Sequence, residues 1–192
     1  MKHILTYALL LLINYCFAQK RNYDVILFGK KIGSTTVERI DKGNGIVNYK
    51  LTSSSEVEIL FSKKTSYMNS DVFFKDGKLY SSYVKNIKDG VTEITNVLWE
   101  ATKYIIKKGS EVLHLDKQLD YSSINLYFSE PVGRTSIFSE RLGGFTTFKK
   151  TAEGVYECKL DNGVNNIYRY RNGELYELEI SKGASVFMRL VK

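Results

Sequence analysis

Residues 155–190 read VYECKLDNGVNNIYRYRNGELYELEISKGASVFMRL, and the spacing of their apolar side chains decides the fold. Most of these side chains fall on even numbers from Tyr156 to Leu190, whereas the odd positions carry many of the Arg and Glu residues. A period of two is typical of strands with one buried face. We therefore expect four antiparallel strands here, with the even-numbered side chains facing inward.

The turns between these strands must preserve the two-residue phase. A three-residue loop at 161–163 sets Leu160 opposite Val164, and one at 171–173 sets Tyr168 opposite Tyr176. The sequence thus predicts type I turns with glycine in the left-handed bulge position at the third residue of each loop.

The remainder of the chain has a similar organisation. Glycine marks the gaps between short runs rich in Tyr, Phe, Val, Ile and Thr, as consecutive hairpins require. Residues 117–130 break this rhythm, because Tyr121, Ile124 and Phe128 share a helical face and Pro131 forbids continuation beyond Ser129. The predicted fold is all-β: a single antiparallel meander forming a curved sheet, half-barrel or barrel, with one short helix near 122–129.

The N-terminus has the features of a secretory signal peptide at residues 1–18. A short basic region precedes the apolar run Ile4 to Ile13, and Cys16 and Ala18 place small residues before a cut after Ala18. The apolar run is far short of the ~20 residues of a membrane span. Lipidation at Cys16 is the alternative, but Tyr15 stands where that signal needs a small residue. The expected product is periplasmic or secreted.

Residues 19–192 are then expected to form a single β domain without a transmembrane segment. Only Cys158 remains, so stability must come from packing, which the 43% hydrophobic composition can supply. The net charge of +7 would suit nucleic acid, but export argues against that partner. The basic residues also come as scattered pairs, which predicts a solvated rim or attraction to anionic surfaces: Lys20-Arg21, Lys30-Lys31, Lys63-Lys64, Lys107-Lys108 and Lys149-Lys150.

Four segments resemble secreted domain-of-unknown-function families found in Gram-negative envelopes. They are residues 23–33, which begin Tyr-Asp-Val-Ile-Leu-Phe-Gly, Phe128-Ser-Glu-Pro-Val-Gly133, Ile137-Phe-Ser-Glu140, and residues 155–175. The resemblance implies a curved sheet or half-barrel, similar in outline to lipocalin-like and lipoprotein-carrier folds. It brings no catalytic residues, because these families have no assigned chemistry.

The residues themselves do not indicate an enzyme. His114 is the only histidine after the leader and lies in a strand-like stretch, so no Ser/His/Asp or Cys/His relay is evident. Glu130 and Glu140 form only a weak candidate pair for glycoside hydrolysis. Cys158 lies on the inward phase and is expected to be a buried structural thiol. No metal site or cofactor is expected, because no pair of His or Cys residues has ligand spacing.

Four tyrosines are the candidate binding residues. Tyr156, Tyr168, Tyr170 and Tyr176 share the inward phase and either pack in a core or line a concave surface for an apolar ligand. We expect a non-catalytic exported envelope protein that binds an apolar or lipid-like small molecule. The alternative is a structural or interaction module that meets another envelope protein through a sheet edge or its basic rim. An enzyme is the least expected class.

Overall fold

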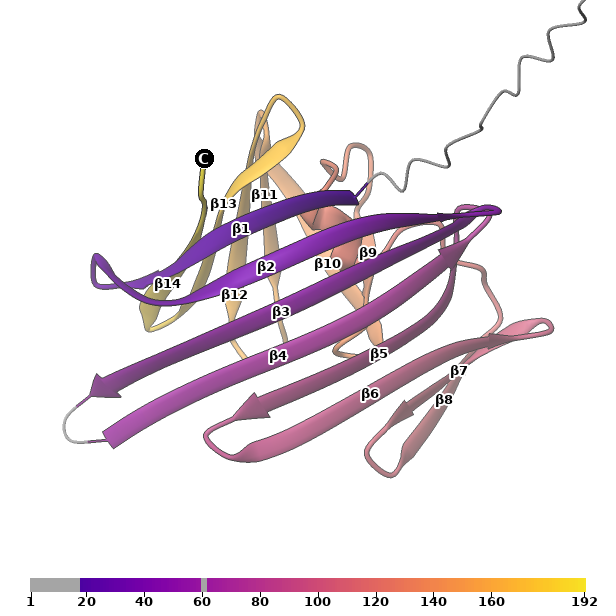
Figure 1. Cartoon of the computed structure of the whole chain (residues 1–192), viewed down its shortest axis with the longest axis horizontal. Coiled ribbons are helices and arrows are strands. Elements are labelled where there is room, and N and C mark those ends of the chain that lie inside the picture. The colour runs from indigo at the N-terminus through magenta and orange to yellow at the C-terminus, as the bar shows by residue number, and fades with distance from the viewer. Residues whose placement is uncertain (1–17, 60–61) are drawn as a thin grey trace, which may run out of the picture.

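The computed structural model describes residues 18–59 and 62–192, which form a strongly curved sheet and a short 3-10 helix (Figure 1). The expected leader peptide, residues 1–18, lies outside these ranges except for Ala18, with which the first strand begins. The elements are β1 (Ala18–Leu27), β2 (Lys30–Gly43), β3 (Ile46–Ile59), β4 (Ser62–Lys75), β5 (Lys78–Lys88), β6 (Val91–Glu100), β7 (Lys103–Lys108), β8 (Glu111–Leu115), η1 (Ser123–Tyr127), β9 (Ser136–Ser139), β10 (Gly144–Ala152), β11 (Val155–Lys159), β12 (Asn165–Arg171), β13 (Glu174–Lys182) and β14 (Ala184–Leu190).

All strands belong to one antiparallel sheet with the order β8-β7-β6-β5-β4-β3-β2-β1-β14-β13-β12-β11-β10-β9. Neighbours in the sheet are also neighbours in sequence, except β1 and β14. These two strands pair from Tyr23 with Leu190 to Leu27 with Val186. β8 and β9 remain the two edges, so the sheet is open. The predicted all-β antiparallel meander is confirmed, in its open, curved form.

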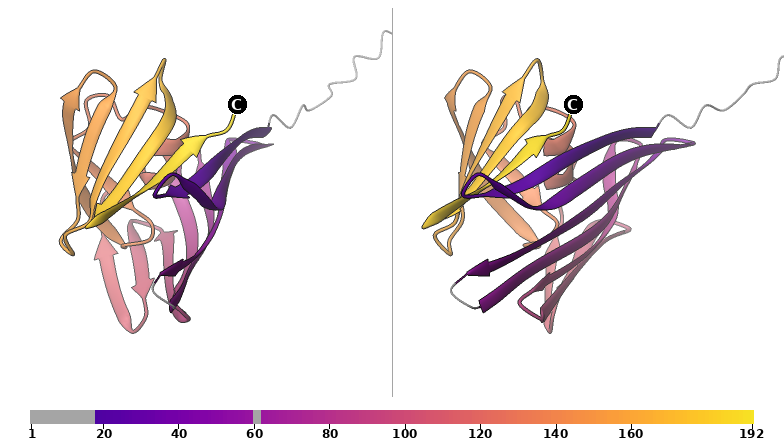
Figure 2. Two further views of the ribbon diagram at one scale, coloured as in Figure 1. Left: turned by 90° about the vertical axis from the view of Figure 1, so that its left-hand side faces the viewer. Right: turned by 60° about the vertical axis from the view of Figure 1, so that its left-hand side comes forward.

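The sheet consists of two leaves that meet where β1 pairs with β14 (Figure 2). We call β1–β8 the N-terminal leaf and β9–β14 the C-terminal leaf. Residues 116–135, the inner segment, connect β8 to β9 and pack between the leaves. Its side chains Leu119, Ile124 and Leu126 are at most 5% exposed and belong to the main hydrophobic core.

The predicted short helix is present, but it is a 3-10 helix that ends at Tyr127. Ser122 caps it: the Ser122 N–H donates to Oδ1 of Asn125 at 2.8 Å, and the Asn125 N–H donates back to the Ser122 carbonyl at 3.0 Å. This reciprocal pair satisfies the first donors of the helix. Five residues bounded by a cap and, a few residues later, by Pro131 leave no room for a regular α-helix.

One of the two predicted turns is confirmed. Gly163 has a φ of +79°. Its N–H donates to the Leu160 carbonyl at 3.0 Å, and the Leu160 N–H donates to the Val164 carbonyl at 2.8 Å. Cys158 pairs with Asn166 as expected. Residues 161–163 therefore form a three-residue loop with glycine in the left-handed position.

The other turn is built differently from the prediction. Asn172 and Gly173 both have positive φ, +53° and +75°, and Arg171 pairs directly with Glu174, so the loop has two residues. A bulge then follows: Tyr170 pairs with Leu175, and Arg169 with Glu177. Tyr176 is the extra residue. The two-residue turn suits the twist of the strands, and the bulge restores the even phase afterwards.

The even-numbered side chains otherwise face inward as predicted. Buried members of this set are Tyr156, Cys158, Tyr168, Tyr170, Leu178 and Met188. At the bulge, Leu175 is fully buried in place of Tyr176, so the predicted inward position of Tyr176 is wrong.

Gly33 of β2 tests how closely the strands approach. A Cβ at this position would lie 2.0 Å from the Ser54 carbonyl oxygen and 2.6 Å from the Ser55 Cα, both backbone atoms of β3. We expect Gly33→Ala to lower the free energy of unfolding by roughly 1–3 kcal/mol, because the strands would have to separate. Gly144→Ala in β10 is the matched control, since nothing lies within 4 Å of its Cβ position. If urea unfolding shows equal losses of unfolding free energy for both variants, β2 and β3 do not contact each other this closely at Gly33.

Candidate functional site

A partly open cavity of about 400 Å³ lies between the two leaves. Leu51, Met68 and Val84 line it from β3, β4 and β5 of the N-terminal leaf, and Tyr168, Leu178 and Met188 line it from the C-terminal leaf. The η1 helix and the tip of the β9–β10 hairpin complete the lining. This volume lies at the lower end of the range for small-molecule sites.

Polar side chains make up nearly half of the lining. Asn86 contributes from β5, and Thr146 and Asn166 contribute from the C-terminal leaf. The Oδ1 atom of Asn166 is buried and has no hydrogen-bond partner among the described residues. Buried acceptors are normally paired, so this unpaired oxygen is an exception.

The tyrosines of the predicted site divide between two environments. Tyr168 lines the cavity, where its ring packs against Phe148 with 5.3 Å between centroids. Tyr156 and Tyr170 lie against the inner segment instead. Their hydroxyls donate to a carboxylate oxygen of Glu130 at 2.8 Å and to the Leu126 carbonyl at 2.9 Å. Burial raises the pKa of both hydroxyls, so both remain protonated donors at neutral pH.

The structure separates Tyr176 from the other three. Tyr168 pairs with Leu178 and not with Tyr176, which corrects the predicted cross-strand pair. The Tyr176 ring lies under the Arg171 guanidinium, 4.8 Å from the ring centroid. The cause is the bulge after the Asn172-Gly173 turn, which the alternation of apolar residues alone does not reveal.

Glu140 is a buried carboxyl that the cavity shares with the inner segment. Its side chain is part of the cavity lining, yet the residue is only 2% exposed. The hydroxyls of Ser122 and Ser123 donate to its two oxygens, and the Ile124 N–H donates at 3.3 Å. Burial raises the pKa of Glu140, and the two serine hydrogen bonds act against this rise. Glu140 thus ties the hairpin tip to the start of η1.

This carboxyl should make stability depend on pH in a specific direction. A folded-state pKa above the unfolded value means that Glu140 favours the folded state at low pH, and that this contribution is lost as the pH rises through the folded-state pKa. Glu140→Gln cannot titrate. We expect the unfolding free energy of Glu140→Gln, relative to the parent, to increase as the pH rises above the ordinary glutamate value of 4.5.

Urea unfolding across this pH range measures that difference. Asp120 and Glu179, whose pKa values are lowered by hydrogen bonds from Arg134 and Arg169, titrate in both proteins and cancel in the comparison. A difference that does not change with pH would contradict the burial of a titrating Glu140.

The remaining sequence candidates lie where their patterns suggested. Cys158 is buried, and burial raises the pKa of its thiol, which disfavours the nucleophilic thiolate. His114 is exposed on the edge strand β8. Glu130 accepts the hydrogen bond from Tyr156, and Glu140 is held by the serines, so both carboxyls of the weak glycosidase pair take part in packing contacts.

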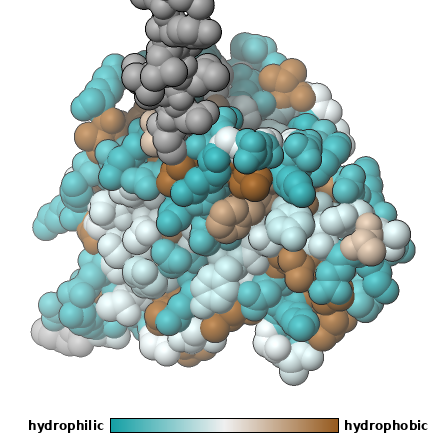
Figure 3. All heavy atoms as spheres, turned by 45° about the vertical axis from the view of Figure 1, so that its right-hand side comes forward, coloured by the Kyte–Doolittle hydropathy of each residue, from teal (hydrophilic) through white to brown (hydrophobic). Residues whose placement is uncertain are grey.

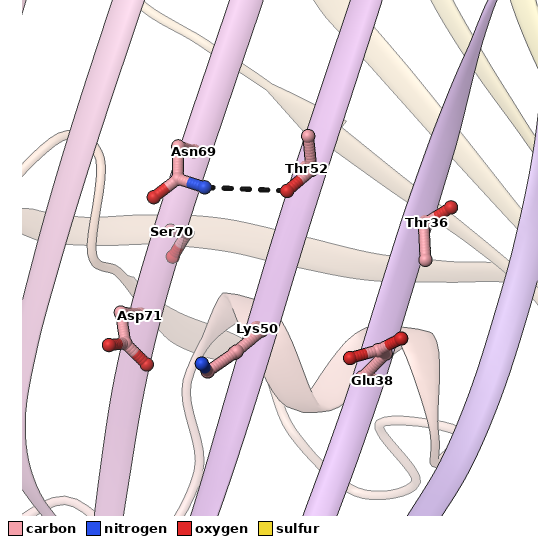
Figure 4. Close-up of a pocket in the computed structure, with 7 residues that line it drawn as sticks. All are labelled: Thr36, Glu38, Lys50, Thr52, Asn69, Ser70 and Asp71. Atoms are coloured by element: carbon pink, nitrogen blue, oxygen red, sulfur yellow. Dashed lines mark hydrogen bonds between the residues drawn. The ribbon is translucent and has the colours of Figure 1, made fainter.

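The outer face carries a small polar groove of about 190 Å³ over β2, β3 and β4 (Figure 4). Lys50 pairs in register with Glu38 on one side and Asp71 on the other. Asn69 donates to the Thr52 hydroxyl at 3.3 Å. Cross-strand pairs of opposite charge stabilise sheets. We assign it a structural role.

The basic pairs of the sequence are partly neutralised by carboxylates. Lys20 lies 3.1 Å from Glu38 and Lys31 lies 2.6 Å from Asp24, both measured from Nζ to a carboxylate oxygen. Lys63, Lys64 and Lys150 have similar partners. The face in Figure 3 accordingly shows hydrophilic side chains with apolar ones interspersed. This face therefore mixes polar and apolar side chains, and the lysines with these partners form no single-sign charged patch.

Fold and cavity together define an open, curved β-sheet protein of the β-barrel-like class. The chain belongs to the family described as domain of unknown function DUF6134, whose model matches residues 23–191. It is also similar to the crystal structure of a β-barrel-like protein of domain of unknown function DUF1849 from Brucella abortus. The two are 14% identical over 90% of this chain and 95% of that chain, with a TM-score of 0.56. At this identity the likeness concerns the fold alone.

The comparison with curated proteins found no match. The family match and the structural similarity confirm the expected resemblance to a domain-of-unknown-function family with a curved β fold. Within the described residues, no helix is long and apolar enough to cross a membrane. In the same part of the chain, no three His, Cys, Asp or Glu side chains lie close enough together to hold a metal ion.

Sequence analysis missed the contribution of the β9–β10 hairpin tip. Residues 140–143 join strands that carry only a short apolar pattern, and their charged side chains look like those of an ordinary loop. The one signal was the pair Ile137 and Phe138, both buried, just before Glu140. Two consecutive buried residues indicate an element covered on both faces.

Proposed function

We propose that this protein is a non-catalytic exported protein whose interior cavity binds an apolar, lipid-like small molecule. The observation that carries the proposal is the cavity between the two leaves. Leu, Met, Val and aromatic side chains from seven strands line it, and twelve of its twenty-six described lining residues are polar or charged. Concave sites that combine apolar side chains with polar groups that orient a ligand are typical of small-molecule binding.

The chemistry of the cavity supports binding over catalysis. Its acidic lining residue, Glu140, already accepts three hydrogen bonds, and the Cys158 thiol has a raised pKa. His114 lies on β8, which contributes no residue to the cavity lining. A general base and an activated nucleophile within reach of each other are therefore not apparent among the described lining residues.

Export is the second part of the proposal. The basic start, the apolar run and the small residues at Cys16 and Ala18 support cleavage that leaves Gln19 first. The intact mass of the exported protein checks this: a mass starting at Gln19 supports it, and an acyl group on Cys16 contradicts it.

Blocking the cavity tests the proposed function. Ser66 lines the open part of the cavity from β4, and Ser54 on β3 is close to it in the sheet but is not a lining residue; both are exposed. We expect Ser66→Trp to weaken binding of the uncharged fluorescent probe N-phenyl-1-naphthylamine by about tenfold or more, equivalent to about 1.4 kcal/mol, because the indole occupies the space of the probe. Ser54→Trp adds the same side chain outside the cavity and should bind normally.

Fluorescence titration of the parent and both variants gives the answer. The near-UV circular dichroism of each variant must match the parent, which separates blocked binding from lost packing. A parent that does not bind the probe, or a Ser66→Trp protein that binds it as well as Ser54→Trp does, would reject the cavity as the site.

A second candidate function rests on the unpaired edge strand β8. Phe73, Leu98 and Ile105 lie in one row of register partners that crosses β4–β7 and ends at His114 on β8. This row borders an outer-face hollow of about 420 Å³. Val112 and Leu113 of β8 are about half exposed, at 54% and 50%. An exposed apolar edge can add a strand from a partner. Native mass spectrometry separates the two: a carrier retains a small molecule, whereas an interaction module retains a protein.

A further inference from the structure

Arg141 reaches the cavity from the tip of the β9–β10 hairpin. Thr95 of β6 donates its hydroxyl to the Arg141 carbonyl at 2.9 Å, and Gly143 approaches Ile106 of β7 so closely that a Cβ there would lie 2.8 Å from its methyl group. The tip thus extends from the C-terminal leaf onto the N-terminal leaf. These contacts fix the backbone of Arg141 while its side chain lines the cavity.

The guanidinium of Arg141 is a charge without a protein partner. It is partly buried, and among the described residues no carboxylate lies within 4 Å of it and no hydrogen bond leaves it. Arg21, Arg134, Arg169 and Arg189 form ion pairs, whereas Arg39, like Arg141, forms none among the described residues. Burial raises the pKa of the Tyr168 hydroxyl, and the positive charge of Arg141 slightly opposes that rise.

Lys88 adds a second positive charge to the lining. It follows Val84 and Asn86 on the inner face of β5 and lies roughly 13 Å beyond Val84, at the end of the strand. Thr95, which holds Arg141, is the register partner of Val84. The two cations therefore lie along one side of the cavity, and neither forms an ion pair among the described residues.

The balance of charge in the cavity is positive. Glu140 is the acidic side chain of the lining, and its oxygens are directed to Ser122, Ser123 and Ile124. Lys88 is exposed, whereas Arg141 is partly buried. A partly buried cation without a protein partner is costly unless a ligand supplies the counter-charge. Charge-assisted hydrogen bonds from a guanidinium suit carboxylates and phosphates.

We propose that the cavity selects a single-chain amphiphile with an anionic head group, bound by Arg141, with Lys88 adding attraction at the end of β5. The inference rests on the proposed function and names the class of its ligand. The volume of about 400 Å³ suits one acyl chain better than the two chains of a membrane phospholipid. The apolar walls take the chain, and the anion neutralises Arg141.

Three probes that share one dansyl-labelled acyl chain test this: the free carboxylate, the phosphate monoester of the corresponding alcohol, and the uncharged methyl ester. We expect the full-length parent to bind both anions at least about tenfold more tightly than the ester. Arg141→Gln should lose this preference and bind the ester as the parent does. Lys88→Gln should lose part of it. Lys85→Gln, which removes a charge from the outer face of the same strand, should keep it.

Each outcome decides the matter. If Arg141→Gln binds both anions as the parent does, the head-group inference is wrong, and the cavity proposal stands as long as the ester binds. If the parent binds none of the three probes, the proposed function fails as well. Tighter binding of the phosphate than of the carboxylate would identify a lysophospholipid-like ligand. Tighter binding of the carboxylate would identify a fatty acid. Should Arg141→Gln not fold, Arg141→Lys keeps the charge and must keep a preference for the anions.

Discussion

The pairing of β1 with β14 is the constraint on which the rest of the structure depends. Among the described strands it is the one pairing that joins distant parts of the chain, and its register runs from Tyr23–Leu190 to Leu27–Val186. Closing so long a loop costs entropy that local hairpins do not. Its apolar register pairs offset that cost, and the Tyr23 hydroxyl adds a 3.1 Å hydrogen bond to the Leu175 carbonyl of β13. The two leaves face each other because of this seam.

The inner segment keeps the leaves apart at one end of the molecule. A segment with little strand pairing can be buried only if its backbone groups find other partners, and tyrosine hydroxyls supply some of them. Tyr104 donates to the Leu79 carbonyl at 2.7 Å and accepts the Leu119 N–H at 3.2 Å, while Tyr170 donates to the Leu126 carbonyl. Glu140 holds the start of η1. With this wedge fixed, the leaves cannot close on each other, and the cavity remains beside it.

The sequence predicted the fold well and the site in part. Alternation and glycine-marked turns record local pairing, so the antiparallel meander, the inward phase, the loop at Gly163 and the short helix followed from them. The bulge at Tyr176 did not, because a two-residue turn with a bulge and a three-residue turn preserve the same phase. The cavity and Arg141 were also hidden, since both depend on how the β9–β10 hairpin reaches β6, a contact that no local pattern encodes.

The central claim is that an amphiphile enters the space between the two leaves, and the methionines report on it most directly. Met68 and Met188 line the cavity from opposite leaves, and Met1 is the only other methionine of the chain. In a protein with 13C-labelled methionine methyl groups, a fatty acid spin-labelled on its chain should broaden the signals of both Met68 and Met188. Both signals remaining sharp while the labelled chain is bound would place the ligand elsewhere and contradict the account.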